Sequence, residues 1–303
     1  MGKGKKKKAN NGKKKKADKR TEDDTNVDDS STWVIPEEQY ERARLAAANR
    51  TEDPLKNWTR LQNDECPICM LPLPFKPSDT KYCVTCGATV CMGCVIGTVQ
   101  AHIRDGKGAE KAMEKAATCP YCRSDTAKYD DKYGLDQEMK RVNAGNAETM
   151  CHLGEYYFDG EMGLRQDKVE GLKWYHRAVE AGSGDAAFAL GRCYKDGDGV
   201  EKDMEKAMEY FQKSAELDFV LAFAVIGHLL ISKDEIEQGM LNVRKAAICG
   251  VTDESIFNLL RDGFQCGVIT KDEYAYTLRE NQAACNEMKS DGRECWKRCN
   301  TSR

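Results

Sequence analysis

Eight of the fifteen cysteines stand in four Cys-x-x-Cys pairs within residues 66–122. Two such pairs supply the four thiolates of a tetrahedral zinc site. The sequence carries neither an apolar leader nor a run long enough to span a membrane, so we expect an intracellular protein, cytoplasmic or nuclear, where thiols stay reduced. We therefore predict two structural zinc ions. Their predicted ligands are Cys66, Cys69, Cys83, Cys86, Cys91, Cys94, Cys119 and Cys122.

The spacing of the four pairs leaves open which cysteines share an ion. Gaps of thirteen, four and twenty-four residues separate successive pairs. In a sequential arrangement, the first two pairs bind one ion and the last two bind the other. In an interleaved arrangement, the first and third pairs share one ion, and the second and fourth share the other. A third arrangement gives the two central pairs to one ion and leaves two distant pairs to share the second. Spacing alone does not choose among them.

Zinc bound by four thiolates has no open coordination position, so such ions build a fold and do not activate water. Each supplies on the order of 10 kcal/mol of folding free energy, which a short module with few apolar residues requires. Residues 97–117 favour a helix that Gly106 and Gly108 interrupt. His102 lies there. Because eight cysteines already complete two sites, we predict His102 to be a surface residue, and we predict no catalytic residue.

The first and last pairs resemble those of a RING finger. CPIC at 66–69 and CPYCR at 119–123 look like the first and last ligand pairs of that family. Its eight ligands interleave in a cross-brace, which implies one ion on the first and third pairs and another on the second and fourth. The chain departs from the family in two ways. It has no histidine among its middle ligands, and it has four residues at 87–90 where a RING has two.

The RING resemblance implies a groove for a ubiquitin-conjugating enzyme. Ile68 matches the exposed apolar anchor of the family, and Pro120 matches the proline that flanks the groove. Arg123 matches the residue that bridges ubiquitin and the conjugating enzyme, for which a planar guanidinium is suited. The aromatic residue that many RINGs carry between the sixth and seventh ligands is absent. The resemblance implies a ubiquitin-protein transferase without a covalent intermediate; the alternative is a non-catalytic, zinc-stabilised scaffold for protein interactions.

The central stretch CVTCGATVCMGC matches the spacing of a FYVE finger, another cross-brace. That family binds phosphatidylinositol 3-phosphate through a basic run at its third ligand, an upstream WxxD motif and an arginine before its seventh ligand. Here the corresponding positions are residues 79–82, Trp58 followed by Leu61, and residues 117–118 before Cys119. None of them carries the lipid-reading side chain, so we expect a cross-brace without lipid binding.

The first thirty residues are strongly charged. Residues 1–20 hold ten lysines, one arginine and one aspartate, and residues 21–30 hold five acidic side chains and no basic one. A segment with so few apolar residues cannot offset its ordering entropy, so we predict a disordered arm. Clustered lysines could attract nucleic acid or an anionic surface, and a purely solubilising role is the alternative.

The second half of the chain repeats itself with a period of roughly 36 residues. LGEYYFDGEMGLRQDKVEGLKWYHRAVEAG at 153–182 aligns with LGRCYKDGDGVEKDMEKAMEYFQKSAELD at 190–218. Each copy predicts two helices joined by a glycine-containing loop, and such hairpins stack into a solenoid. Gly154 and Gly191 fall in the first helix of their copies, where the missing side chain lets the second helix approach.

These residues resemble the Sel-1-like repeat, a relative of the tetratricopeptide repeat. Two weaker copies follow at 222–250 and 254–288, and the last would cap the stack. The resemblance implies a surface for a protein partner, here the substrate of the ligase. The predicted fold class is mostly α, a helical-hairpin solenoid preceded by a small zinc-binding, RING-like cross-brace domain.

The predicted organisation has five parts. They are a disordered Lys-rich and then acidic arm at 1–32, a helical linker at 33–60, a RING-like zinc finger at 61–128, about four Sel-1-like repeats at 135–290 of which the last two are degenerate, and a tail at 291–303. Five further cysteines lie at helical positions and are predicted core residues: Cys151, Cys193, Cys249, Cys266 and Cys285. Cys295 and Cys299 in the tail lack two partner ligands, so we predict no third zinc site.

Overall fold

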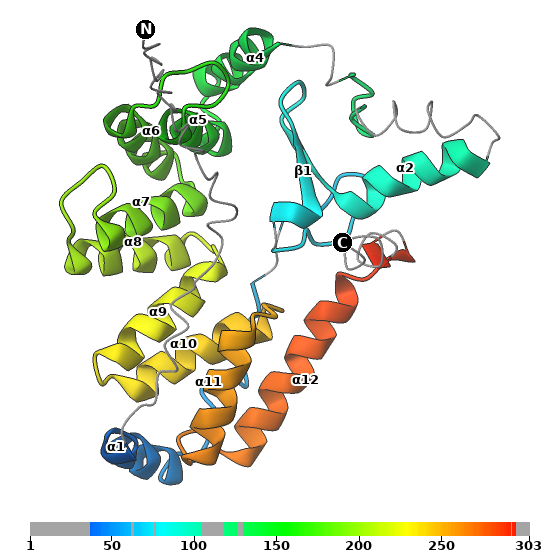
Figure 1. The fold of residues 1–303 in the computed structure, drawn as a ribbon. Coiled ribbons are helices and arrows are strands. Elements are labelled where there is room, and N and C mark those ends of the chain that lie inside the picture. The colour runs from blue at the N-terminus through cyan, green and yellow to red at the C-terminus, as the bar shows by residue number, and fades with distance from the viewer. Residues whose placement is uncertain are drawn as a thin grey trace, which may run out of the picture. The chain divides into compact units, whose positions relative to one another are not determined.

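The computed structural model describes residues 37–61, 64–75, 77–104, 118–125, 130–291 and 293–294. The predicted arm at residues 1–32, the tail cysteines Cys295 and Cys299, and the side chain of His102 lie outside the described part. Helices dominate the described chain, and most of them pair into successive hairpins (Figure 1). The fold class is therefore the predicted one, a mostly α helical-hairpin solenoid preceded by a small cysteine-rich module.

Four helical hairpins form the repeat array, which runs from green to red in Figure 1. Their helices are α5 (Ala147–Asp159) with α6 (Lys168–Glu180), α7 (Gly184–Asp196) with α8 (Met204–Glu216), α9 (Leu221–Ser232) with α10 (Ile236–Ile248), and α11 (Glu254–Gln265) with α12 (Lys271–Glu287). One more helix, α4 (Asp131–Asn143), precedes the array and contributes Val142 to the core of the first hairpin.

Polar side chains fix where most of these helices begin. At each such start, a side-chain oxygen accepts a hydrogen bond from a backbone N–H of the first turn, which satisfies a donor that the helix cannot satisfy itself. The residues that cap the helices in this way are Asp130, Asn146, Asp167, Ser183, Asp203, Asp253 and Thr270. Helices α9 and α10 lack such a cap, and they belong to one of the two weaker copies of the repeat.

Glycine sets the distance between the two helices of a hairpin. A Cβ atom at Gly154 would lie 2.6 Å from Cδ1 of Tyr175, and one at Gly191 would lie 2.6 Å from Cδ1 of Phe211. Carbon atoms do not approach so closely without a clash, so the second helix packs here only because the side chain is missing. The predicted role of these two glycines is confirmed.

The core of the array consists of side chains that neighbouring hairpins share. Leu153, Tyr175 and Leu190 belong to one buried cluster, which joins α5, α6 and α7. Of the five cysteines predicted as core residues, three are buried and two, Cys266 and Cys285, are half-buried. No described helix has the length and apolar character needed to cross a membrane.

The segment before the cysteine-rich module is only partly helical. Helix α1 (Glu37–Ala48) packs its buried face, which includes Tyr40 and Ala47, against α10. The chain then leaves the helix, and Pro54 disfavours helical backbone at the residue before it. Residues 49–61 continue without helix and include a turn at residues 54–57, so the described helical part of the predicted linker at 33–60 is residues 37–48.

The cysteine-rich module, residues 64–125 as far as they are described, contains little regular structure. Strands β1 (Thr80–Cys83) and β2 (Ala88–Cys91) form an antiparallel hairpin in which Cys83 pairs with Ala88. A short 3-10 helix (Pro77–Asp79) precedes β1, and α2 (Met92–Arg104) follows β2 directly. The predicted helix at 97–117 therefore starts earlier than expected, and residues 105–117 lie outside the described part.

Candidate metal centres

The eight predicted zinc ligands gather in two clusters. The first cluster comprises Cys66, Cys69, Cys91 and Cys94, and the second comprises Cys83, Cys86, Cys119 and Cys122; within each, the sulfur atoms all lie within 4.8 Å of one another. The first and third Cys-x-x-Cys pairs thus come together, and so do the second and fourth. This is the interleaved arrangement, and Cys66 and Cys83 lie in different clusters.

The distances between sulfur atoms fit a tetrahedral ion. Zinc–sulfur bonds of about 2.3 Å place the corners of a tetrahedron about 3.8 Å apart. In the first cluster, Sγ of Cys66 lies 3.8 Å from Sγ of Cys94, and Sγ of Cys69 lies 3.8 Å from Sγ of Cys91. In the second, the corresponding distances are 3.8 Å and 4.0 Å. All eight thiols are free of disulfides, so both clusters could hold a metal ion.

Three of the four cysteine pairs lie on loops of the same backbone shape, which we call knuckles. In each knuckle, the N–H of the fifth residue donates to the carbonyl oxygen of the first cysteine, and the fifth residue has a positive φ. The three bonds are Met70 to Cys66 (2.9 Å), Gly87 to Cys83 (2.7 Å) and Arg123 to Cys119 (2.8 Å), with φ of 55°, 73° and 61° at the donors. The remaining pair, Cys91 and Cys94, lies where β2 passes into α2.

Backbone N–H groups point at the sulfur atoms inside the clusters. The N–H of Cys91 lies 3.4 Å from Sγ of Cys66. Burial raises the pKa of the Cys66 thiol, but backbone donors at Cys69, Cys91 and Ile68 outweigh burial and lower its pKa to about 7. In the same cluster, burial and the neighbouring thiols raise the pKa of Cys94. Backbone donors thus favour the thiolate at Cys66, and a cation among the sulfur atoms would offset the burial and repulsion that disfavour a thiolate at Cys94.

Two arginines of the helical part hold the cysteine-rich module by backbone carbonyl groups in or next to its knuckles. Arg293, which is 4% exposed, donates to the carbonyl oxygens of Pro72 (2.7 Å) and Leu71 (3.3 Å), and its Nη2 lies 3.6 Å from Sγ of Cys69. Arg141 of α4 donates to the carbonyl oxygens of Val84 and Thr85, between the first two ligands of the second cluster. Each cluster therefore has a guanidinium at its border, and sequence analysis did not identify either one.

A second contact joins α4 to β1. The hydroxyl of Tyr82 donates to Oε2 of Glu138 at 3.3 Å, and the other carboxylate oxygen of Glu138 accepts from Arg141 at 2.9 Å. Glu138 is fully buried. Burial raises its pKa, and the nearby guanidinium of Arg141 acts in the opposite direction. The carboxylate of Glu138 thus keeps Arg141 oriented toward the knuckle of Cys83 and Cys86.

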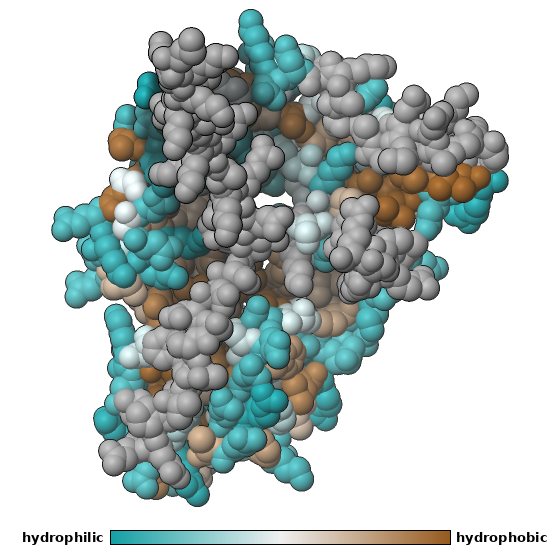
Figure 2. Space-filling view, in the orientation of Figure 1, coloured by the Kyte–Doolittle hydropathy of each residue, from teal (hydrophilic) through white to brown (hydrophobic). Residues whose placement is uncertain are grey.

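The three residues predicted to contact a conjugating enzyme lie on the knuckles. Ile68 lies on the knuckle of Cys66 and Cys69 and is 40% exposed. Pro120 and Arg123 lie on the knuckle of Cys119 and Cys122, where Pro120 is half-buried and Arg123 is exposed. Met70 and Tyr121 on the same loops are 64% and 54% exposed, and sequence analysis missed them. Met70 follows Cys69 and Tyr121 precedes Cys122 in the sequence, and this position next to a predicted zinc ligand was the signal that could have identified them. Figure 2 also shows apolar residues along α2, at the right of the view.

Changing Gly87 to alanine is expected to weaken the module. A residue with a side chain is strained at this positive φ by about 1–2 kcal/mol, and the new Cβ would lie 2.8 Å from Cδ of Arg141. Gly97 in α2 is the matched control, because a Cβ there meets nothing within 4 Å and alanine favours a helix by about 0.5–1 kcal/mol. Compared with wild type, Gly87→Ala should unfold at a lower chelator concentration, whereas Gly97→Ala should not. Equal shifts in both variants would contradict the knuckle geometry.

Comparison with known families identifies the repeats. Residues 147–183 and 184–219 match the model of the Sel1 repeat, and these ranges contain the first two hairpins, α5–α6 and α7–α8. This match confirms the first two of the predicted Sel-1-like repeats. No RING or zinc-finger family model matches the chain.

Curated relatives resemble parts of the chain. The chitin synthase regulator SKT5 of Saccharomyces cerevisiae is 30% identical over 93 residues, which cover 30% of this chain and 13% of that protein. Chitin synthase regulatory factor 3 of Schizosaccharomyces pombe is 24% identical over 151 residues, 45% of this chain and 16% of that protein. The ERAD-associated E3 ubiquitin-protein ligase component HRD3B of Arabidopsis thaliana is 38% identical over 76 residues, 25% of this chain and 11% of that protein. The chain thus spans less than a fifth of each of these relatives.

Two solved structures are similar to the helical part. A Sel1 repeat protein from Oxalobacter formigenes has a TM-score of 0.39 at 25% identity and covers 42% of this chain and 97% of its own. A protective antigen of uropathogenic Escherichia coli with an SLR fold has a TM-score of 0.42 at 22% identity and covers 65% of this chain and 43% of its own.

Proposed function

We propose that the chain is a RING-type ubiquitin ligase in which the cysteine-rich module recruits a ubiquitin-conjugating enzyme and the repeats hold the protein substrate. The observation that carries the proposal is the interleaved grouping of the eight cysteines, which is the ligand order of the RING cross-brace. The two zinc ions in this proposal are structural, because four thiolates fill the coordination sphere of each.

The proposed mechanism uses no nucleophile of the chain. A conjugating enzyme carries ubiquitin as a thioester, and the ligase accelerates transfer by holding that thioester in a reactive geometry near the substrate amine. Ile68, which is 40% exposed, would supply an apolar anchor beside Pro120. The exposed guanidinium of Arg123 would donate hydrogen bonds to ubiquitin and to the conjugating enzyme. Ubiquitin passes directly from the conjugating enzyme to the acceptor amine, without a covalent intermediate on the ligase.

The repeats support the substrate-binding half of the proposal. Stacked helical hairpins present extended surfaces that suit protein partners. The name of HRD3B describes a component of an E3 ubiquitin-protein ligase, so a repeat segment 38% identical to this one occurs in a protein associated with ubiquitin ligation.

Autoubiquitination with a panel of conjugating enzymes tests the proposal. We expect wild-type protein to form chains, and Ile68→Ala and Arg123→Gly each to reduce chain formation by about tenfold, since interface anchors typically contribute more than 1 kcal/mol. Glycine is chosen at position 123 because the backbone there has a φ of 61°, so this change removes the guanidinium without straining the knuckle.

Val169→Ala is the matched control for the loss of an exposed aliphatic side chain, because Val169 of α6 is 59% exposed and lies outside the module. It should form chains as wild type does. Absence of chains from wild-type protein with every conjugating enzyme, or chain formation by the two module variants equal to that of Val169→Ala, would overturn the ligase proposal.

The second candidate function is a zinc-stabilised scaffold that binds proteins without catalysis. The contacts of the module with Arg293 and Arg141 favour it, because they give the module a structural role in holding the helical part together. Two relatives named as regulators of chitin synthase also favour a regulatory role. Failure to bind any conjugating enzyme, together with stable capture of a protein partner, would select the scaffold.

The location of the protein and the role of its arm remain proposals as well. We propose an intracellular protein, cytoplasmic or nuclear, whose Lys-rich residues 1–20 attract nucleic acid or an anionic surface. The ten lysines of this segment support such attraction, which salt would screen.

A further inference from the structure

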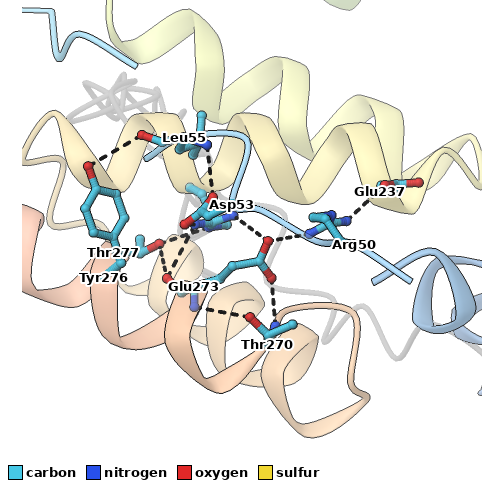
Figure 3. A network of polar contacts seen from close by, with 9 residues as sticks. Arg50, Asp53, Leu55, Glu237, Thr270, Glu273, Tyr276 and Thr277 are labelled. Atoms are coloured by element: carbon cyan, nitrogen blue, oxygen red, sulfur yellow. Dashed lines mark hydrogen bonds and ion pairs between the residues drawn. The ribbon is translucent and has the colours of Figure 1, made fainter. Parts of the chain in front are cut away.

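The chain binds a segment of itself on one face of the repeat array. Residues 50–61, which follow α1, lie across α10 and α12 and attach to them through side chains (Figure 3). Some of the hydrogen bonds that their backbone donates stay within the segment, as in the turns that Lys56 and Trp58 close with Asp53 and Leu55. Attachment through side chains at spaced positions is how a groove reads a linear peptide.

Four charged side chains alternate in sign at the centre of this face. Arg50 of the segment pairs with Glu273 of α12, and Asp53 of the segment accepts from Arg244 of α10 at 2.6 Å. Arg244 also lies 3.3 Å from Glu273 and donates to Thr277 at 3.0 Å. Figure 3 shows the side chains of Arg50, Asp53 and Glu273 converging where the segment meets the helices.

The charges balance separately on each side of the contact. The segment contributes one arginine and one aspartate, and the helices contribute Arg244 and Glu273, which pair with each other. Departure of the segment therefore leaves no unpaired charge buried in the helical face, and this removes the main cost of opening a buried ionic network. A face that is complete without its occupant has the property expected of a binding site.

Apolar and aromatic anchors follow the charged pair. Leu55 is 2% exposed, and its carbonyl oxygen accepts from the hydroxyl of Tyr276 at 3.4 Å. The ring of Trp58 meets the ring of Phe223 edge-on at 6.0 Å, and the ammonium of Lys245 lies 5.8 Å from the centre of the Trp58 ring. The segment thus contributes one buried leucine and one half-buried tryptophan, and a few such apolar and aromatic anchors carry most of the affinity at protein interfaces.

We propose that the face formed by α10 and α12 is a binding groove for a linear peptide of a partner protein, and that residues 50–58 occupy it as an internal ligand. The peptide that fits presents arginine, then aspartate three residues later, leucine two residues after that and tryptophan three residues further on. A tethered segment acts at an effective concentration of about millimolar. A partner must therefore displace it, so binding and release of residues 50–58 are linked. This inference concerns the repeats and stands apart from ligase activity.

Peptide binding by the full chain tests the proposal. The probe is a fluorescent peptide with the sequence of residues 48–61, and the variant Asp53→Asn/Leu55→Ala weakens the internal ligand while leaving the helical face intact. We expect the probe to bind this variant at least about tenfold more tightly than it binds wild type, because only the open fraction of the groove binds a competitor. A probe with the same two substitutions is the matched control and should not bind.

Three outcomes would overturn the proposal. The first is a folded variant that does not bind the probe, and the second is equal binding of the probe and its substituted control. The third is a concentration-dependent dimer of wild-type protein that the probe dissociates, which would assign the groove to residues 50–58 of a second copy.

Hydrogen exchange in wild-type protein covers the case of a variant that does not fold. If residues 50–58 are a displaceable ligand, their amides should exchange through local opening, faster than the amides of α10 and α12, and faster still with excess unlabelled probe. Exchange of the segment only together with both helices would show that it is an inseparable part of the core and would overturn the proposal.

Discussion

Replacing Cys83 by serine is expected to reduce bound zinc from two ions per chain to one and to unfold the cysteine-rich module. Each four-thiolate site supplies on the order of 10 kcal/mol, which matches the entire stability of a typical domain, about 5–15 kcal/mol. Cys83 is 1% exposed and shares a cluster with three other thiols, so its loss leaves three of the four thiolates that a tetrahedral zinc site requires. Elemental analysis gives the zinc content, and far-ultraviolet circular dichroism together with limited proteolysis reports the fold.

Paired substitutions distinguish the two ways of connecting the cysteines. Cys83→Ser/Cys119→Ser removes two ligands of one cluster and should cost one ion, whereas Cys66→Ser/Cys83→Ser removes one ligand from each cluster and should cost both. If the cysteines were connected sequentially, Cys83→Ser/Cys119→Ser would cost both ions and Cys66→Ser/Cys83→Ser would cost one. Cys151→Ala is the control, because Cys151 is buried in the repeats and its loss should leave two ions bound. Two ions retained by Cys83→Ser would contradict the proposed sites.

Replacing Glu273 by alanine is expected to destabilise the repeat array by about 3–5 kcal/mol, the cost of breaking a buried ion pair from one side. The Glu273 side chain is 4% exposed and lies against the guanidinium groups of both Arg50 and Arg244. Its carboxylate also accepts the N–H of Thr270 at 2.8 Å, completing the capping box of α12. One substitution thus leaves the buried Arg244 and the half-buried Arg50 with fewer acceptors and removes one of the two hydrogen bonds of the capping box.

Glu237 provides the matched control for this prediction. It also pairs with Arg50, at 2.9 Å, but its side chain is 47% exposed. Exposed pairs contribute less than about 1 kcal/mol, so Glu237→Ala should lower the urea midpoint of the helical signal only slightly. A similar loss of stability in both variants would show that burial of the network does not matter.

The sequence predicted the parts of the molecule whose causes are local. A Cys-x-x-Cys pair brings its two thiols together within one loop, and glycines such as Gly154 mark where two helices of one hairpin touch. The interleaved grouping is less local, because Cys83 meets Cys119 across the hairpin β1–β2 and α2. The resemblance to a cross-brace, and not the spacing, indicated that grouping.

The missed features are contacts between segments far apart in the chain. Arg293 and Leu71 are separated by more than two hundred residues, and nothing around Arg293 in the sequence distinguishes it from the other arginines of the chain. Arg244 is likewise an ordinary helical arginine in sequence, yet it is 2% exposed because a distant turn covers it. Arg123 was interpreted only as a partner contact, whereas its φ of 61° also gives it the backbone role of Gly87.

The contacts of Arg141 and Arg293 with the cysteine-rich module have a mechanical consequence. A stack of helical hairpins in which each unit contacts only its neighbours can bend and twist along its length. Here Arg141, in the helix before the first hairpin, and Arg293, just after the last, both grip one small module. Moving the two ends of the array apart therefore requires breaking one of these two sets of hydrogen bonds, so the cysteine-rich module acts as a cross-link between the ends of the array.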